Sequence, residues 1–233
     1  MNVKYEGKDL EAMFFAQNYH RWVLSVFKSF LGKKIAEVGA GSGNISSMLL
    51  LEKPHELVVV EPSDEMYPKL KNVFLQNSSV VCVQGLFSDV YKKYNNHFDS
   101  IVYVNVLEHI ENDVLELSYI HHSLIQGGCV CIFVPALPYL YSEFDASIGH
   151  YRRYTKHGLK SILEESGFEI IKISYFDMIG IIPWFIVFKL FRKKLSAKNT
   201  SVYDTFVVPF SKKLESILPV PIGKNLIVIA RKK

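Results

Sequence analysis

The sequence predicts an α/β protein with a doubly wound, mostly parallel sheet of seven strands and helices on both faces of the sheet. Three observations favour this class. Short apolar runs alternate with segments of helical spacing along most of the 233 residues. The runs are apolar at consecutive positions, as in parallel strands that are covered on both faces. Three glycines, within residues 39–43, follow the first run directly.

Each element follows from a local pattern. An amphipathic helix over residues 10–30 precedes the first strand. Thr155 suits the N-cap of the helix that follows it, because a hydroxyl accepts hydrogen bonds from the first free amides of a helix. Gly167 suits the end of that helix, because glycine readily adopts the left-handed conformation found after many helices. The predicted strands cover residues 34–38, 57–60, 80–83, 98–104, 129–134, 168–175 and, antiparallel, 225–230; the remaining helices cover 44–51, 64–75, 113–124 and 155–166.

Residues 176–224 interrupt this alternation. The stretch is too long for a hairpin and too apolar for a linker, so we expect a helical insertion that packs on the sheet edge or forms a lid. The chain is then a single domain over 1–233, with a helical cap at 1–30, a core at 31–175, the insertion at 176–224 and a final strand at 225–233.

Charge is unevenly distributed along the chain. Residues 1–149 carry 11 Lys and Arg against 17 Asp and Glu, whereas residues 150–233 carry 16 against 6. The acidic first part favours a neutral or cationic ligand, and the basic second part favours a phosphate-bearing substrate, a nucleic acid or a membrane surface. Solvated lysine is the alternative for any single residue.

The cysteines and the apolar stretches bear on localisation. Cys82, Cys129 and Cys131 form no C-x-x-C pair and lie in apolar runs, as reduced core cysteines do. The N-terminus has no signal-peptide segment, and the longest apolar stretch, 178–191, is shorter than the roughly 20 residues that span a bilayer. We therefore expect a cytoplasmic protein without a transmembrane helix.

The glycine turn predicts a ligand site. Gly39, Gly41 and Gly43 stand between the first strand and a helix, and Glu61 ends the second strand, where a carboxylate can accept both hydroxyls of a ribose. A tight turn with a chance acidic residue is the alternative. A dinucleotide site would need glycine or alanine at Asn44, and Glu37 would repel a pyrophosphate but suits a sulfonium or ammonium cation.

These motifs resemble those of the class I S-adenosylmethionine-dependent methyltransferases, which have a Rossmann-like fold. The resemblance rests on 37–43, on Glu61-Pro62, on 98–102 running into 105–109 and on the glycine pair 127–128. It implies that S-adenosylmethionine is the cofactor and that residues of these motifs bind it, namely Glu37, Gly39, Ala40, Gly41, Gly43, Glu61, Pro62, Gln84, Gly85, Leu86 and Asn105. Many relatives have Asp in the 84–86 segment, so a backbone or Gln84 amide contact would replace the carboxylate at the adenine.

Three further residues are candidates around that cofactor. Tyr19, on the first helix, is expected to close over it. His109 and His150 are candidate bases for an acceptor, because imidazole exchanges a proton near neutral pH; capping a turn is the alternative role for His109. Glu108-His109 resembles the E-x-x-E-H metal motif of some O-methyltransferases, but Asn105 replaces the first acid and leaves a poor site for a hard cation, so no metal is predicted.

A polar and aromatic loop over 141–154 follows the fifth strand. Its arginines suit phosphate or carboxylate and its tyrosines suit a sugar face, which makes this loop a candidate substrate site. The alternative is that Asp145 and Glu143 pair with the arginines to brace the loop. The G-H-Y-R-R-Y run is similar to loops in bacterial methyltransferases of glycan and surface-polysaccharide clusters. The candidate substrate residues are Tyr141, Tyr151, Arg152, Arg153 and Tyr154.

The sequence therefore favours methyl transfer from S-adenosylmethionine to a small or sugar-bearing acceptor, at oxygen. An RNA or protein methyltransferase that uses the basic second part is one alternative, and a non-catalytic module that binds the cofactor is another. A nucleic-acid partner is not favoured, because the asparagine-proline-proline-aromatic tetrapeptide of many N-methyltransferases is absent after the fourth strand. The apolar segment 178–194, with its basic end, could contact a membrane surface or pack on the sheet.

Overall fold

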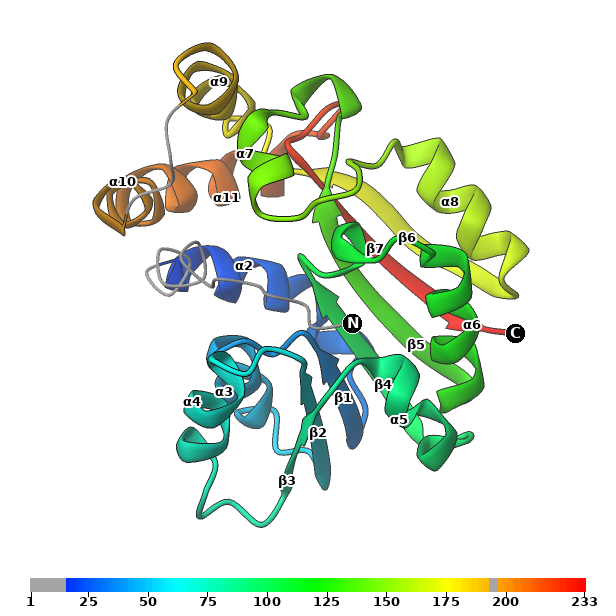
Figure 1. Ribbon diagram of the computed structural model, residues 1–233. Coiled ribbons are helices and arrows are strands. Elements are labelled where there is room, and N and C mark those ends of the chain that lie inside the picture. Colours follow the sequence, from blue (N-terminus) through cyan, green and yellow to red (C-terminus); the bar gives the residue numbers. More distant parts are fainter. Residues whose placement is uncertain (1–15, 193–196) are drawn as a thin grey trace.

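The computed structural model describes residues 16–192 and 197–233 and confirms the predicted fold class (Figure 1). Its sheet has seven strands in the order β3-β2-β1-β4-β5-β7-β6. The strands are β1 (Lys34–Val38), β2 (Glu56–Glu61), β3 (Val80–Gln84), β4 (Phe98–Val104), β5 (Leu124–Pro135), β6 (Phe168–Phe176) and β7 (Asn225–Lys232). The first five are mutually parallel, and β7 runs antiparallel to both β5 and β6.

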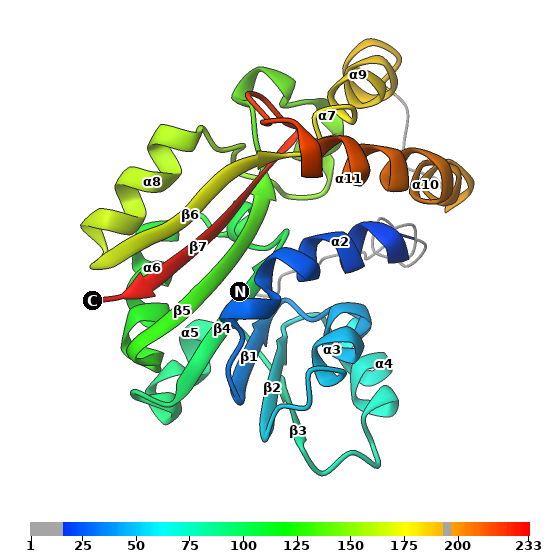
Figure 2. The ribbon, with the colours of Figure 1, turned by 180° about the vertical axis from the view of Figure 1, so that it is seen from behind.

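Helices cover both faces of the sheet, as Figures 1 and 2 show from opposite sides. One face carries α2 (Gln17–Phe27), α3 (Asn44–Leu50) and α4 (Met66–Val73); the other carries α5 (Phe87–Val90), α6 (Asp113–Ser123) and α8 (Lys156–Glu165). Each face has its own apolar layer, with Phe27 and Leu49 in the first and Leu117 and Leu163 in the second. Strands buried on both sides need this double cover, which explains their continuous apolar runs.

Local interactions set the helix ends. The Thr155 hydroxyl accepts from the Gly158 amide at 3.0 Å, and Gly167 has a φ of +89°, so both predicted boundaries of α8 are confirmed. The fifth strand differs from its prediction, since β5 begins at Leu124 rather than at residue 129. Leu124 pairs with Phe98 across an irregularity in β4, so tertiary pairing extends this strand through two glycines.

Short helices complete the connections. They are η1 (Lys28–Phe30), η2 (Tyr91–Tyr94), η3 (Leu107–His109), η4 (Pro138–Leu140) and α7 (Glu143–Ser147). The predicted insertion contains α9 (Ile181–Trp184), η5 (Phe185–Leu190), α10 (Ala197–Val202), η6 (Tyr203–Val207) and α11 (Val208–Ile217). Within the described residues, no helix combines the length and the apolar character that crossing a membrane requires.

The insertion is joined to the first helix by a buried carboxylate. Asp204 accepts hydrogen bonds from the backbone amides of Asn18 and Tyr19 at 2.9 and 2.8 Å, two donors at the start of α2 that have no partner within the helix. A predicted helix start at residue 10 lies outside the described residues. The contact holds the insertion beside α2 at the end of the sheet where β1 and β4 terminate (Figure 1).

Candidate active site

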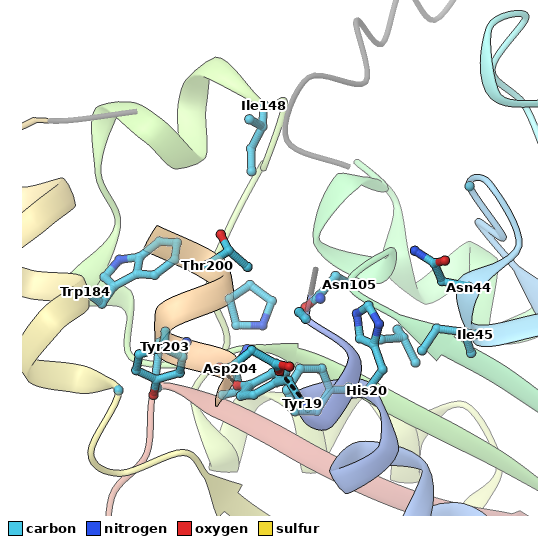
Figure 3. A pocket seen from close by; sticks show the side chains of 18 of the residues that line it. Tyr19, His20, Asn44, Ile45, Asn105, Ile148, Trp184, Thr200, Tyr203 and Asp204 are labelled. Atoms are coloured by element: carbon cyan, nitrogen blue, oxygen red, sulfur yellow. Dashed lines mark hydrogen bonds between the residues drawn. The ribbon is translucent and has the colours of Figure 1, made fainter. Parts of the chain in front are cut away.

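A cavity of about 350 Å³ opens at the carboxyl ends of the parallel strands. Its walls come from α2, from the turn between β1 and α3, from the residues that follow β4, and from the insertion. Figure 3 shows Tyr19 and His20 of α2 on one side, with Trp184 and Thr200 of the insertion on another. The insertion therefore closes the place at which open α/β sheets bind ligands, and the size is in the usual range for small-molecule sites.

The glycine turn adopts the geometry that its sequence predicts. Gly39, Gly41 and Gly43 have φ values of +72°, +56° and +92°. A Cβ built on Gly39 would lie 2.4 Å from a methyl group of Val106, so both conformation and space require glycine there. Gly39 and Gly41 line the cavity together with Ala40. Gly43 is the N-cap residue of α3 and is buried behind the turn.

Glu37 provides a buried negative group in the cavity wall. Its side chain is 3% exposed, accepts a hydrogen bond from the Ser46 hydroxyl and lines the cavity. Burial raises the pKa of Glu37 to about 8, with the nearby Glu61 adding to the effect and Ser46 opposing it. A cation in the cavity would favour the ionised form of this carboxyl group, so Glu37 suits a sulfonium or an ammonium ligand.

Glu61 ends β2 beside the glycine turn. One carboxylate oxygen accepts from the Gly41 amide at 2.7 Å, and the other accepts from the Ser63 amide at 2.8 Å. Burial raises the pKa of Glu61 while these two hydrogen bonds lower it. Each oxygen retains a lone pair for a ribose hydroxyl. Glu61 and the half-buried Pro62 are not among the residues that line the cavity, and Glu61 lies next to the turn through its bond to Gly41.

The 84–86 segment lies next to Glu61 at the end of β3. Gln84 is paired with Glu61 in the sheet, and its side-chain amide donates to Asp64 at 2.8 Å. Gly85 has a φ of +143°, and Leu86 is exposed. The Asp that many relatives have in the 84–86 segment is absent here, but the Asp64 carboxylate lies at the same edge of the sheet. Asp64 comes from the loop after β2 and accepts from Gln84.

Asn105 and Tyr19 project into the cavity from different elements (Figure 3). Asn105 follows β4 with a φ of +54°, and its backbone amide donates to Phe133 of β5 at 2.8 Å. A non-glycine residue in this strained conformation directly after a strand is typical of binding sites. The Tyr19 hydroxyl donates to Asn225 at 3.1 Å, which fixes the ring between α2 and β7.

Two predicted histidines are brought together. The rings of His109, after β4, and His150, in the loop after β5, meet edge to face with centroids 4.5 Å apart, and both line the cavity. His150 Nδ1 lies 3.0 Å from Asp145, and its Nε2 lies 3.8 Å from the buried Glu108. Burial, followed by the proximity of His150, lowers the pKa of His109 to about 4, so that imidazole is neutral at physiological pH.

The substrate candidates separate into two groups. Arg153 lines the cavity but is bonded to Asp145 at 2.8 Å and stacks on the Trp184 ring at 4.5 Å. Tyr154 is buried, and its hydroxyl donates to Asp113 at 2.8 Å, where Arg152 also binds. The bracing role considered for this loop is therefore present, with Asp113 as an additional partner and Glu143 bound to a different arginine.

The remaining two tyrosines of the loop are also outside the cavity lining. Tyr141 donates its hydroxyl to the His150 carbonyl at 2.6 Å, and Tyr151 is exposed. Of the five substrate candidates, only Arg153 is thus brought to the cavity. Tyr141 contributes indirectly, because its hydrogen bond to the His150 carbonyl holds the backbone from which the His150 ring reaches the cavity.

Several cavity residues carry no recognisable sequence pattern. Lys224 precedes β7, binds Asp177 at 3.0 Å and lies over the rings of Tyr19 and Tyr203. Nothing local distinguishes it from a surface lysine, because its partners are far away in the sequence. Further lining residues of this kind are His20, Asp204 and Asn225, whereas Phe144 and Ile148 belong to the 141–154 loop and Trp184 and Phe188 to the 178–194 segment noted in the sequence.

Comparisons with known proteins agree with this fold. The sequence model of a family described as a methyltransferase domain matches residues 12–173. A search of curated proteins found no match. A solved S-adenosylmethionine-dependent methyltransferase from Archaeoglobus fulgidus is similar, with a TM-score of 0.64, 18% identity and coverage of 93% of this chain and 94% of that one.

Two other solved structures share the fold. An S-adenosylmethionine-dependent methyltransferase from Mesorhizobium loti has a TM-score of 0.60 and 14% identity, covering 90% of this chain and 95% of that one. A phosphoethanolamine N-methyltransferase from Haemonchus contortus, solved with S-adenosyl-L-methionine, has a TM-score of 0.61 and 18% identity, covering 94% of this chain and 56% of that one.

The residues present fit that cofactor. A glycine turn leaves room for a ligand against the backbone, and the adjacent buried carboxyl of Glu37 faces the cavity where a cationic group would lie. The family match covers more than half of the chain and includes this turn and Glu61. The chain therefore belongs to the methyltransferase domain family, whose enzymes use S-adenosylmethionine as the methyl donor.

Proposed function

We propose that this methyltransferase acts on an oxygen of a small or sugar-bearing acceptor. The observation that carries the proposal is that one continuous cavity extends from the glycine turn to His109 and His150. The cofactor supplies a methyl group on a sulfonium, which is already activated, so the protein has to align an acceptor with it and assist loss of the acceptor's proton. An imidazole pair in the cavity lining suits a hydroxyl, whose proton must leave.

The cofactor-binding part of the proposal uses the first half of the chain. Gly39, Gly41 and Asn105 would hold the methionine portion, with Glu37 opposite its positive charge, and Glu61 would accept from the ribose. Leu86 would offer an apolar surface to the adenine. These roles follow from the positions of the residues along one edge of the sheet, where β1, β2, β3 and β4 all end.

The acceptor-binding part uses the loop after β5 and the insertion. Asp145 orients His150 by accepting at Nδ1, which leaves Nε2 available. Trp184, which lies between Arg153 and Phe188, contributes to an aromatic wall of the cavity, and such walls suit the apolar face of a sugar ring. Cavity residues such as Phe144 and Phe188 are apolar, so the acceptor would combine an apolar face with a few hydroxyl groups.

The two positively charged side chains of the cavity are each paired with a carboxylate, which favours a small or sugar-bearing acceptor over a nucleic acid. Arg153 is bonded to Asp145 and Lys224 to Asp177, so neither offers an uncompensated charge to a phosphate. Recognition of RNA would require a track of such charges along the backbone of the ligand.

The test is a methyl-transfer assay with S-adenosylmethionine tritiated on the methyl group. Acceptors would include sugar nucleotides, phenols and aliphatic alcohols, with RNA and a mixed peptide pool as competing classes. We expect label in a hydroxyl-bearing acceptor and formation of S-adenosylhomocysteine. His150→Gln should lose at least about tenfold in kcat while cofactor affinity stays within about twofold, because general acid–base help is typically worth more than that.

Two outcomes would contradict the proposal. Label in RNA or peptide alone would assign the competing methyltransferase function. Calorimetric binding of S-adenosylmethionine without turnover on any acceptor class would favour a non-catalytic binding module.

We also propose that the insertion contacts an anionic membrane surface. The outer side of α9 and η5 presents Ile182, Phe185, Ile186 and Leu190 at helical spacing, with Ile182 65% and Leu190 62% exposed. The opposite side of the same segment lines the cavity, so a membrane contact would bring the cavity next to the lipid. Lys189 is exposed nearby, and its ammonium, which donates to the Tyr141 carbonyl, adds a positive charge for anionic headgroups.

Flotation with phosphatidylglycerol-containing vesicles tests this contact. We expect partitioning to be lost in the double variant Phe185→Ser with Leu190→Ser and retained in Leu51→Ser, an exposed leucine at the end of α3. Equal partitioning of wild type and double variant would refute the proposal. Trp184 is not a suitable probe, because its ring faces Arg153 rather than solvent.

A further inference from the structure

The cluster of Glu108, His109 and His150 is more than an acid–base pair. Each residue offers one ligand atom, and these atoms lie within 4.8 Å of one another. We propose that the three side chains bind a divalent transition-metal ion, such as Zn²⁺, with an open coordination position toward the cavity. The binding of the ion does not depend on the proposed function, but its role there does: it would activate the acceptor hydroxyl.

Glu108 carries the strongest observation. Its side chain is completely buried, and among the described residues neither carboxylate oxygen has a hydrogen-bond partner. Buried carboxylates are normally paired, hydrogen-bonded or bound to a metal, because water no longer compensates the charge. Arg153 acts on Glu108 through its charge, but its hydrogen bonds go to Asp145 and to the Ala136 carbonyl. A cation between Glu108 and the two imidazoles would supply the missing partner.

The imidazoles are oriented as metal ligands are. Asp145 accepts at His150 Nδ1, so His150 presents Nε2 on the side of Glu108. His109 has a hydrogen bond with the backbone of Gly149, in the same loop. Ligating histidines nearly always use their other ring nitrogen in this way. Asp145 is itself held by the Ser142 amide and hydroxyl at 2.9 and 2.8 Å.

The distances agree with a shared ion. Two ligands that lie about 2.1 Å from a tetrahedral metal ion are about 3.4 Å apart. The 3.8 Å between His150 Nε2 and Glu108 Oε1 differs from this by a few tenths of an ångström. All three ligand atoms lie within 4.8 Å of one another, so side-chain rotations in η3 and in the loop after β5 would bring them to this spacing.

The donor set indicates the kind of metal. Two nitrogens and one carboxylate favour Zn²⁺ and neighbouring first-row ions over Mg²⁺ or Ca²⁺, which prefer oxygen ligands. Asn105 stands where a hard-cation site would need an acid, so the sequence alone predicts no metal. In the structure, His150 joins Glu108 and His109 from a loop 41 positions beyond His109 and adds a nitrogen ligand. His109 and His150 line the cavity, so an acceptor can reach the ion from that side.

In the reaction, the acceptor hydroxyl would occupy the open position. Both imidazoles are then ligands that hold the ion rather than bases, so coordination lowers the pKa of the bound hydroxyl and its proton leaves to water. The alkoxide oxygen then forms a bond to the methyl carbon while the carbon–sulfur bond breaks. That electron pair remains on sulfur, so the sulfonium becomes a neutral thioether, and charge and atoms balance without an oxidant or a reductant.

Metal binding can be measured without any acceptor. The full-length protein, treated with a chelator and dialysed, would be titrated with Zn²⁺ by calorimetry and with Co²⁺ by visible absorption. We expect one ion per chain and visible bands of tetrahedral or five-coordinate Co²⁺. Glu108→Gln preserves shape and should weaken Zn²⁺ binding about 100-fold or more, whereas Glu111→Gln, an exposed neighbour, should leave it unchanged.

Two further readouts separate this proposal from the proposed function. Cofactor binding by Glu108→Gln verifies that the variant is folded, and His150→Ala is compared with His157→Ala, which alters an exposed histidine of α8. Equal Zn²⁺ affinity of wild type and both cluster variants would overturn the metal site. Full methyl-transfer activity in metal-free protein would overturn its role. A Co²⁺ spectrum that depends on Glu108, without transfer to any acceptor, would support the site and refute the proposed function.

Discussion

Replacement of Glu37 should stabilise the protein and at the same time weaken its cofactor binding. Burial raises the pKa of Glu37 to about 8, whereas the unfolded chain has the ordinary value of 4.5. The folded state therefore holds the proton more tightly. The protonated Glu37 therefore makes its full contribution to stability at pH values below the unfolded pKa of 4.5. That contribution is lost as the pH rises from there through the folded pKa of about 8. Glu37→Gln removes that loss and keeps a group that can bond to Ser46.

The magnitude follows from the two pKa values. Between about pH 5 and about pH 7, titration of Glu37 alone lowers the free energy of unfolding of the wild type by about 2.5 kcal/mol. The free energy of unfolding of Glu37→Gln should therefore exceed that of the wild type by about 2.5 kcal/mol more at pH 7 than at pH 5. The other buried carboxyl groups are common to both proteins and cancel in this comparison. Glu169→Gln, an exposed position on β6, should show no such change.

Urea unfolding followed by circular dichroism, without cofactor, measures this difference. Calorimetry on the same samples should show S-adenosylmethionine binding about 10- to 150-fold more weakly in Glu37→Gln, the usual worth of a charge-assisted contact. A difference in stability that stays constant with pH would show that Glu37 is ionised and hydrated in the empty cavity, and the reasoning from its burial would fail.

Other substitutions test the turn, the loop and a helix cap. Gly39→Ala should abolish measurable cofactor binding, because its Cβ would meet a valine methyl at 2.4 Å; Gly127→Ala, with a similar φ of +76° but open space, should retain binding in the same calorimetric assay. Asp145→Asn should lower the free energy of unfolding by about 3–5 kcal/mol by leaving a buried guanidinium unpaired, whereas Glu143→Gln, in an exposed pair, should change it by less than about 1 kcal/mol in urea titrations. Thr155→Ala should cost about 1 kcal/mol in the same titrations, through loss of the α8 cap.

Much of the fold could be predicted because its determinants are local. A strand buried on both sides needs consecutive apolar residues, as in 98–104, and a helix needs spacing and caps, as at Thr155. The glycine turn is local as well, since φ and the space for a side chain depend on a few neighbouring residues. The one strand that differed clearly, β5, was extended by pairing with residues of β4 that are distant in the sequence.

The acceptor side of the cavity could be predicted only in part. The 141–154 loop was identified by its composition, but composition cannot tell an arginine that faces a ligand from one that is bonded to a carboxylate. Arg152 and Tyr154 converge on Asp113 of another helix, and this pairing depends on how α6 and the loop pack together. Lys224 likewise acquires its aromatic surroundings only when β7 is inserted between β5 and β6.

By itself, the sequence determined the sheet, the glycine turn with Glu61, and hence the family and the methyl donor. These depend on spacing within about 30 residues, which chain connectivity preserves. Tertiary structure alone decided that His150 would meet Glu108 and His109, that Asp204 would hold the insertion on α2, and that the outer side of α9 would remain exposed. Such contacts join distant segments, and their geometry is set by packing of the whole domain rather than by any local pattern.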